Sequence, residues 1–180
     1  GKPLMQALKA RQSSRAIAPD SLPVQVLSDL LWAANGINRP DAGKRTAPSA
    51  RNWQEVDIYV VQAQGTYRYN ATSHTLVGIA AGDLRLLTGA QPFVAQAPLN
   101  LVYVVDTARM TGSAPGEEQT LYMGADTGFI GQNVYLYCAS EGLATVIRGS
   151  LDRPGLATAL GLTPQMHIVL AQTVGYPATP

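Results

Sequence analysis

Residues 99–105 form the most restrictive segment of this sequence, because Leu-Asn-Leu-Val-Tyr-Val-Val is a nearly continuous apolar run. Such a run is typical of a β-strand that is covered on both faces, whereas a strand with one face in solvent alternates apolar and polar residues. The rest of the chain must therefore supply two covering layers. We expect a central strand in a sheet that packs against helices.

The overall composition indicates that much apolar surface is hidden. The chain has 180 residues, of which 46% are hydrophobic and 14% charged, well below the roughly 25% charged share of ordinary soluble domains. A length of this kind favours one domain over residues 1–180. A large subunit interface would hide the remaining apolar surface.

Helical and strand patterns are mixed along the chain without an internal repeat, which predicts an α+β fold. The expected helices cover residues 3–9, 26–34 (with Ser21 as N-cap), 83–87, 117–140 and 152–160. The expected strands cover residues 56–63, 67–69, 75–80, 99–105, 144–148 and 167–174. Loops are expected at residues 38–51 and 106–116, and a tail at residues 177–180.

Three glycines lie on or near one face of the long helix expected at residues 117–140: Gly124, Gly128 and Gly131. Each costs about 1 kcal/mol relative to alanine inside a helix. Close approach of another backbone or of a planar ligand would offset that cost. We therefore expect this helix to be central.

Several classes of function are excluded by what the sequence lacks. The net charge of +1 gives no electrostatic footprint for nucleic acid or a membrane surface, and no apolar run approaches the roughly 20 residues of a membrane span. The single Cys138 and the separated His74 and His167 do not form a metal-binding pattern. Dinucleotide-binding, P-loop, serine-hydrolase and zincin motifs are also absent. We take a cytoplasmic location as the default, and we leave an exported one open because the sequence begins with Gly1 rather than Met.

Three polar clusters remain as candidate binding sites. Arg11-x-Ser13-x-Arg15 offers two guanidinium groups and a hydroxyl, which suit a phosphate monoester, although a solvated turn has the same composition. The loop at residues 43–54 carries hydroxyls and amides that suit the edge of a heterocycle, or only a turn and an N-cap. Arg148-Gly149 at a strand end allows close approach of main chain and positive charge to a ligand, or only a strand-to-helix turn.

Taken in order, these clusters resemble the nitroreductase superfamily of FMN enzymes. The resemblance covers nearly the whole chain and includes further motifs at residues 131–133 (Gly-Gln-Asn), 141–143 (Glu-Gly-Leu) and 174–177 (Val-Gly-Tyr-Pro). The sequence of residues 45–50 is similar to that found in the branch that includes thiazoline oxidase-like dehydrogenases. The family's usual Gln-Pro-Trp appears here as Gln54-Glu55-Val56, and the chain is too short for the large insertions of many members.

The resemblance implies a sandwich of a mostly antiparallel sheet and covering helices, assembled as an intertwined homodimer with shared active sites. It also implies FMN binding by Arg11, Ser13 and Arg15 at the phosphate and ribityl end, by Pro48, Ser49, Ala50 and Asn52 against the flavin of the partner subunit, and by Ile147, Arg148 and Gly149 beside the flavin ring. Gly149 and Arg148 are the candidates that stabilise reduced flavin at N5 and N1–C2. No acid–base residue and no metal is expected.

The activity implied is transfer of two electrons from NADH or NADPH to a small oxidised acceptor such as a nitroaromatic, quinone or enone. An FMN-dependent dehydrogenase or oxidase of an azoline-like substrate is the alternative enzyme, and a non-catalytic flavin-binding protein is the alternative from another class. In either enzyme the redox chemistry belongs to the cofactor, and the protein supplies orientation and electrostatics.

Overall fold

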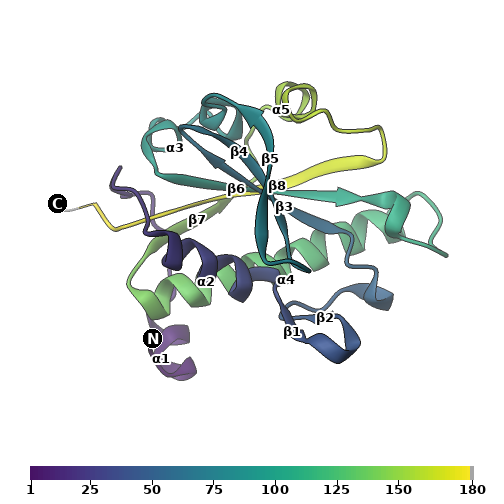
Figure 1. The fold of residues 1–180 in the computed structure, drawn as a ribbon, viewed down its shortest axis with the longest axis horizontal. Helices are drawn as coiled ribbons and strands as arrows, with labels where there is room; N and C mark the ends of the chain where they lie inside the picture. Colours follow the sequence, from purple (N-terminus) through teal and green to yellow (C-terminus); the bar gives the residue numbers. More distant parts are fainter. Residues whose placement is uncertain (179–180) are drawn as a thin grey trace.

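The computed structural model describes residues 1–178, so the last two residues of the predicted tail lie outside the described part. Its centre is an antiparallel sheet of six strands in the order β5-β4-β3-β6-β8-β7 (Figure 1). The strands are β3 (Val56–Gln62), β4 (Gly65–Asn70), β5 (Thr75–Ala81), β6 (Leu99–Asp106), β7 (Ala144–Arg148) and β8 (Met166–Gly175). The predicted α+β fold with a mostly antiparallel sheet is confirmed.

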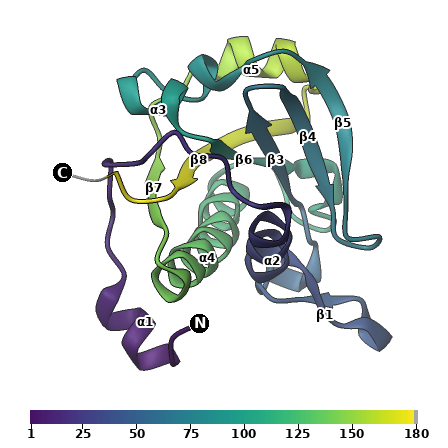
Figure 2. The ribbon, with the colours of Figure 1, turned by 60° about the vertical axis from the view of Figure 1, so that its left-hand side comes forward.

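Helices cover both faces of this sheet (Figure 2). The lower layer in that view holds α2 (Val24–Asn35) and α4 (Glu117–Glu141), with α1 (Leu4–Ala10) beside it. The upper layer holds α3 (Pro92–Gln96) and α5 (Arg153–Leu160), and near them lies the 3₁₀ turn η3 (Arg85–Thr88). At 1.5 Å per residue, the 25 residues of α4 extend about 37 Å across the sheet.

Strand β6 is the central strand that its apolar run predicts. Alternate residues of β6 face opposite sides of the sheet. Leu101 and Tyr103 belong to the core between the sheet and helices α2 and α4, whereas Val102 and Val104 belong to the core between the sheet and α5. Residues 99–105 are all at most 1% exposed. Two separate cores therefore meet across one strand.

The polar segment before β3 is more regular than the sequence indicates. Residues 38–51 were expected to be a loop, but the structure has a short antiparallel ribbon of β1 (Ile37–Arg39) and β2 (Lys44–Arg45), with 3₁₀ turns at Pro40–Ala42 (η1) and Ala50–Asn52 (η2). The Arg39 guanidinium donates to the carbonyl of Arg45 across this ribbon. The prediction of a loop is therefore wrong for this segment. The ribbon is held by side-chain hydrogen bonds rather than by a periodic apolar pattern.

Three expectations about helices have different outcomes. Ser21 does not cap α2, because that helix begins at Val24 after Pro23 and has no side-chain cap. The expected helix at residues 83–87 is instead the 3₁₀ turn η3, followed by α3, which the sequence pattern did not predict. The helix expected at residues 152–160 is α5, and Asp152 caps it, since its side chain accepts from the Gly155 N–H.

The glycines of α4 do not share one environment. A Cβ on Gly131 would lie 2.7 Å from Ile147 Cδ1, so the predicted close approach is found there, with β7 as the neighbour. Gly124 and Gly128 are exposed and have no neighbouring atom within 4 Å of such a Cβ. Of these three glycines, only Gly131 allows close packing of α4 on the sheet.

Candidate functional site

The first cluster lies on an extended strap, residues 11–15, that leaves α1 and runs beside β7. The Ser14 N–H donates to the Thr145 carbonyl at 2.9 Å, which fixes the strap against that strand. Ser13 Oγ lies 2.8 Å from the hydroxyl of Tyr135 on α4. The Arg11 guanidinium lies over the Tyr135 ring, 5.2 Å from its centroid, within the range of a cation–π contact.

Tyr135 connects this strap to the third cluster. Its hydroxyl accepts a hydrogen bond from the Ile147 N–H at 2.9 Å and can donate its own proton to Ser13. The structure therefore brings Arg11, Ser13 and Ile147 together through one buried phenol. The sequence alone did not identify Tyr135 as a site residue, because its position in the helix is typical of a core residue.

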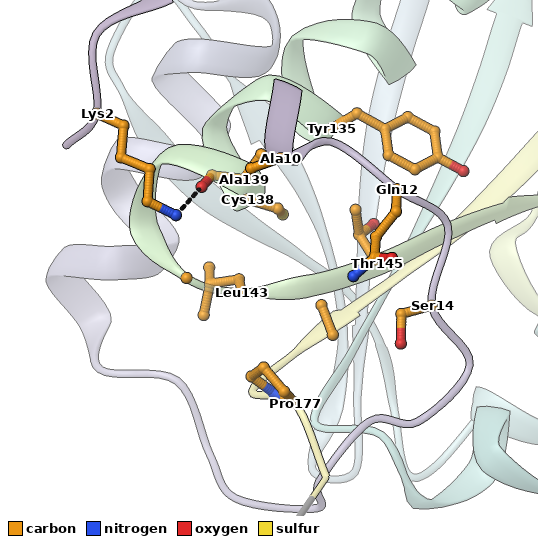
Figure 3. Close-up of a pocket in the computed structure, with 12 residues that line it drawn as sticks. Lys2, Ala10, Gln12, Ser14, Tyr135, Cys138, Ala139, Leu143, Thr145 and Pro177 are labelled. Atoms are coloured by element: carbon orange, nitrogen blue, oxygen red, sulfur yellow. Dashed lines mark hydrogen bonds between the residues drawn. The ribbon is translucent and has the colours of Figure 1, made fainter. Parts of the chain in front are cut away.

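The strap has two sides, as an extended segment does. Gln12 and Ser14 line a cavity of about 260 Å³, together with Cys138, Leu143 and Thr145, and Figure 3 shows these side chains around it. Arg11, Ser13 and Arg15 do not line that cavity. Within residues 1–178 the guanidinium groups of Arg11 and Arg15 make no hydrogen bond or ion pair, so the donors of both are available to an anion.

The Cys138 thiol lies at the buried wall of the same cavity. Its exposed fraction is 1%, and burial raises its pKa to about 12, against a smaller lowering by a hydrogen bond with Thr145. A thiol with this pKa is protonated at neutral pH and a poor nucleophile. Cys138 is therefore a packed core thiol.

The second cluster is a strained turn, residues 48–54. Arg51, Asn52 and Gln54 all have positive φ angles, of 49°, 56° and 50°, each costing about 1–3 kcal/mol for a residue other than glycine. Ser49 Oγ accepts from the Gln54 N–H at 3.0 Å, which closes the turn. Conformations of this kind persist only where surrounding contacts enforce them.

Anchors outside the turn hold it in place. Asp126 of α4 accepts from the Ala50 N–H at 2.9 Å, Trp53 Nε1 donates to the Thr111 carbonyl at 3.0 Å, and Arg51 donates to the Gly112 carbonyl at 2.9 Å. The Asn52 side chain is exposed, and its oxygen accepts from Gln54 at 3.1 Å. The exposed edge of the turn therefore presents Pro48 and Asn52.

The first and second clusters contact different parts of α4. Asp126 holds the turn and Tyr135 holds the strap, and nine residues of helix separate them, or about 13 Å. Within the described residues, no hydrogen bond or ion pair joins the turn to residues 11–15. One chain therefore presents two separate polar surfaces, the strap at residues 11–15 and the turn at residues 48–54.

The structure directs the Arg148 side chain into the interior. Its guanidinium donates to Thr88 O, to Asn100 Oδ1 at 3.0 Å and to Thr173 Oγ1 at 2.8 Å, and burial lowers its pKa to about 10. It therefore stays protonated at neutral pH but is bonded to internal acceptors. Ile147, one residue earlier, faces α4 instead, and Gly149 follows at the exposed end of β7.

Neither a metal site nor a membrane span is found in the described chain. Residues 1–178 contain no group of three or more His, Cys, Asp or Glu side chains that could hold a metal ion. No helix among them is both long and apolar enough to cross a membrane.

Known proteins match this chain over most of its length. The sequence pattern described as the nitroreductase family matches residues 8–176. A protein of Methanocaldococcus jannaschii assigned to the nitroreductases is 32% identical over 157 residues, which covers 82% of this chain and 78% of that protein. A solved structure from Ralstonia eutropha, likewise assigned, is 43% identical with a TM-score of 0.93, and the match covers all of this chain and 85% of that one.

A third match supports the fold alone. It is a structure from Desulfovibrio desulfuricans, assigned to the nitroreductases and solved in complex with FMN. It is 21% identical with a TM-score of 0.70, and the match covers 99% of this chain and 88% of that one. With the family pattern matched over residues 8–176, the chain belongs to the nitroreductase family.

Proposed function

We propose that this protein is an FMN-dependent oxidoreductase that transfers two electrons from NADH or NADPH to a small oxidised acceptor such as a nitroaromatic, quinone or enone. Membership of the nitroreductase family supports the reaction class, and the FMN complex of the Desulfovibrio desulfuricans relative supports the cofactor. Bound FMN would accept a hydride from the nicotinamide and pass two electrons to the acceptor.

The observation that carries the proposal is the donor set around Tyr135. Arg11 and Ser13 both contact Tyr135, and Arg15 follows two residues later on the same strap. In residues 1–178 neither arginine side chain makes a hydrogen bond or ion pair. Two guanidinium groups and a hydroxyl match a terminal phosphate monoester. The residues present therefore fit FMN, whereas no glycine-rich loop for the pyrophosphate of FAD occurs in the sequence.

The end of β7 would present main chain to the flavin ring. Gly149 is exposed and lacks a Cβ, so its backbone can approach a planar ligand closely. Arg148 would act indirectly, because its bonds to Thr88, Asn100 and Thr173 hold the end of this strand. Ile147 would lie beside the ring, with its N–H fixed by Tyr135.

A second copy of the chain would complete each site. Residues 1–178 expose ten large apolar side chains, and seven of them lie on α1, α2 and α4: Leu4, Met5, Leu8, Val24, Trp32, Leu121 and Phe129. This concentration on one helical layer is typical of an obligate interface. In such a homodimer, Pro48, Ser49, Ala50 and Asn52 of one subunit would contact the flavin held by Arg11, Ser13 and Arg15 of the other.

The test combines cofactor identification with electron donors. The purified protein should be yellow and release FMN, not FAD, on denaturation, and anaerobic mixing with NADH or NADPH should bleach the flavin rapidly. Bleaching only by another donor would support oxidation of an azoline-like substrate, and bleaching by no donor would support a binding role. A colourless protein that cannot be reconstituted with FMN would refute the proposal.

Subunit mixing tests the shared site. Arg11→Ala and Asn52→Ala should each weaken FMN binding, Arg11→Ala by about 1.5–3 kcal/mol if a charge-assisted hydrogen bond is lost. In a heterodimer of the two variants, one site carries both substitutions and the other carries neither, so one functional site returns. Heterodimers that bind no more FMN than the parent variants would place the site within one chain.

A further inference from the structure

Glu55 and Asp126 form a buried carboxyl pair behind the strained turn. Glu55 is 0% exposed and Asp126 is 2% exposed. Neither carboxyl oxygen of Glu55 receives a hydrogen bond from a donor in the described residues. Asp126 accepts from the Ala50 N–H at 2.9 Å, and both carboxyl groups line the same small cavity, within reach of each other.

Two facing carboxylates in the interior require a proton between them. An unpaired buried carboxylate is costly, and two of them repel each other. If Glu55 is protonated, its O–H can donate to Asp126, which satisfies both side chains with the atoms present. Below the pKa of Glu55 its carboxyl is therefore neutral, and its proton bridges the two side chains.

The neighbouring cations do not replace that proton. Arg109 donates to the Gln54 carbonyl at 2.8 Å and to Asp57 at 2.7 Å, and Arg45 donates to the Gln54 side chain at 2.9 Å. Burial, followed by the neighbouring Asp126 carboxyl, raises the pKa of Glu55 to about 7, against smaller lowerings by its own backbone amide and by Arg109. The proton therefore leaves within the physiological pH range.

Little room exists for water to solvate an ionised Glu55. The cavity between the turn and α4, lined by Ser49, Glu55 and Asp126 among others, has a volume of about 10 Å³. That is at the lower limit of the roughly 10–15 Å³ that one water molecule needs. Hydration of the charged pair therefore requires the turn at residues 48–54 to move.

We infer that Glu55 and Asp126 are positioning residues that share one proton, and that this proton holds the turn carrying Ser49 and Asn52 in its binding conformation. The inference rests on the proposed function only for the contact of this turn with FMN. The positive φ angles of Arg51 and Asn52 make the turn dependent on its anchors, and the Ala50–Asp126 bond is the anchor next to the pair. Loss of the proton releases the turn and weakens flavin binding.

The test is the pH dependence of FMN affinity in the full-length protein. Apoprotein titrated with FMN should show a dissociation constant that rises about tenfold between pH values below and above 7, as when one charge-assisted hydrogen bond is broken. Glu55→Gln keeps a neutral donor to Asp126, so its affinity should match the low-pH affinity of the native protein and lose this dependence. Glu117→Gln, which neutralises an exposed carboxylate on the same helix, should retain it.

The comparison between variants separates the contribution of the carboxyl pair to the pH dependence from the contribution of the ligand. The phosphate of FMN also titrates, with a second pKa of about 6, and that contribution is common to all three proteins. A native protein and a Glu55→Gln variant with the same pH profile would overturn the inference. A Glu55→Gln profile that is flat relative to the native one would support it.

A measurement without flavin separates this inference from the proposed function. In the apoprotein, the infrared band of a protonated carboxyl should disappear as the pH rises through 7, and hydrogen exchange at the Ala50 amide should then exceed the ordinary increase with pH. If no FMN binds at all, the proposed function fails while these two signals still report on the pair. A carboxyl band that is already absent below pH 7 would overturn the inference, even if Glu55→Gln does not fold.

Discussion

Tyr135→Phe removes one oxygen atom that joins three segments. The hydroxyl bonds to Ser13 at 2.8 Å and to the Ile147 N–H at 2.9 Å, and the side chain is 7% exposed. Loss of the Ser13 bond costs about 0.5–1.5 kcal/mol, and an unpaired buried N–H at Ile147 costs about 1–3 kcal/mol. Together these predict a decrease of roughly 1.5–4.5 kcal/mol in the free energy of unfolding.

The same substitution should weaken FMN binding, because the strap and the end of β7 lose their common support. We expect about a tenfold rise in the dissociation constant, or roughly 1.4 kcal/mol. The ring itself remains, so the contact with the Arg11 guanidinium is retained. The assays are urea unfolding of the apoprotein at fixed concentration and titration with FMN.

Tyr137→Phe is the matched control on the same helix. Its hydroxyl donates to the Val26 carbonyl at 3.3 Å, in a partly buried position away from the strap. This variant should lose about 0.5–1.5 kcal/mol of stability and keep its FMN affinity. Equal stability losses in the two variants, with flavin affinity unchanged in both, would show that Tyr135 does not organise the site.

Three further predictions follow from other contacts. Arg148→Met leaves the Thr88 carbonyl without this donor and leaves Asn100 Oδ1 and Thr173 Oγ1 bonded only to each other, so calorimetry should show a loss of about 1–3 kcal/mol; an unchanged stability would mean that these bonds are not maintained. Between pH 4.5 and about 7 the folded state retains the Glu55 proton more strongly than the unfolded state, so the unfolding free energy should fall as pH rises through this window, and less so in Glu55→Gln. Gly124→Ala should stabilise an isolated chain by about 1 kcal/mol, because the space beside it is open; a weakened dimer in sedimentation experiments would instead place the partner against α4.

The sequence predicts best the elements whose pattern is local. The run at residues 99–105 identifies the central strand because burial on both faces removes polar residues from it, and Gly142 ends α4 because it adopts a left-handed conformation that favours glycine. The ribbon at residues 37–45 was missed because its strands are short and mostly exposed, and because the Arg39 side chain supports it. The five-residue α3 is too short for a helical period to be recognised.

The candidate site was only partly predictable, since its organising contacts are distant in sequence. Ser13 and Tyr135 are 122 residues apart, and Ala50 and Asp126 are 76 residues apart. Local composition selects Arg11 and Ser13 as ligands for an anion, but it does not show that a tyrosine orients them. Likewise, the sequence shows that neighbouring residues of β7 point to opposite faces, but not which face packs against α4. It therefore did not predict that Ile147 faces α4 and that the Arg148 side chain enters the interior.

The sheet order has a consequence for synthesis of the protein. Strand β8 is the last to leave the ribosome, yet it lies inside the sheet between β6 and β7. Until residues 166–175 emerge, the nascent chain has an unpaired edge on its most apolar strand, and β7 has no partner. Open edges of this kind promote aggregation. A chaperone that covers the open edge of β6 until β8 pairs with it would therefore limit aggregation during synthesis.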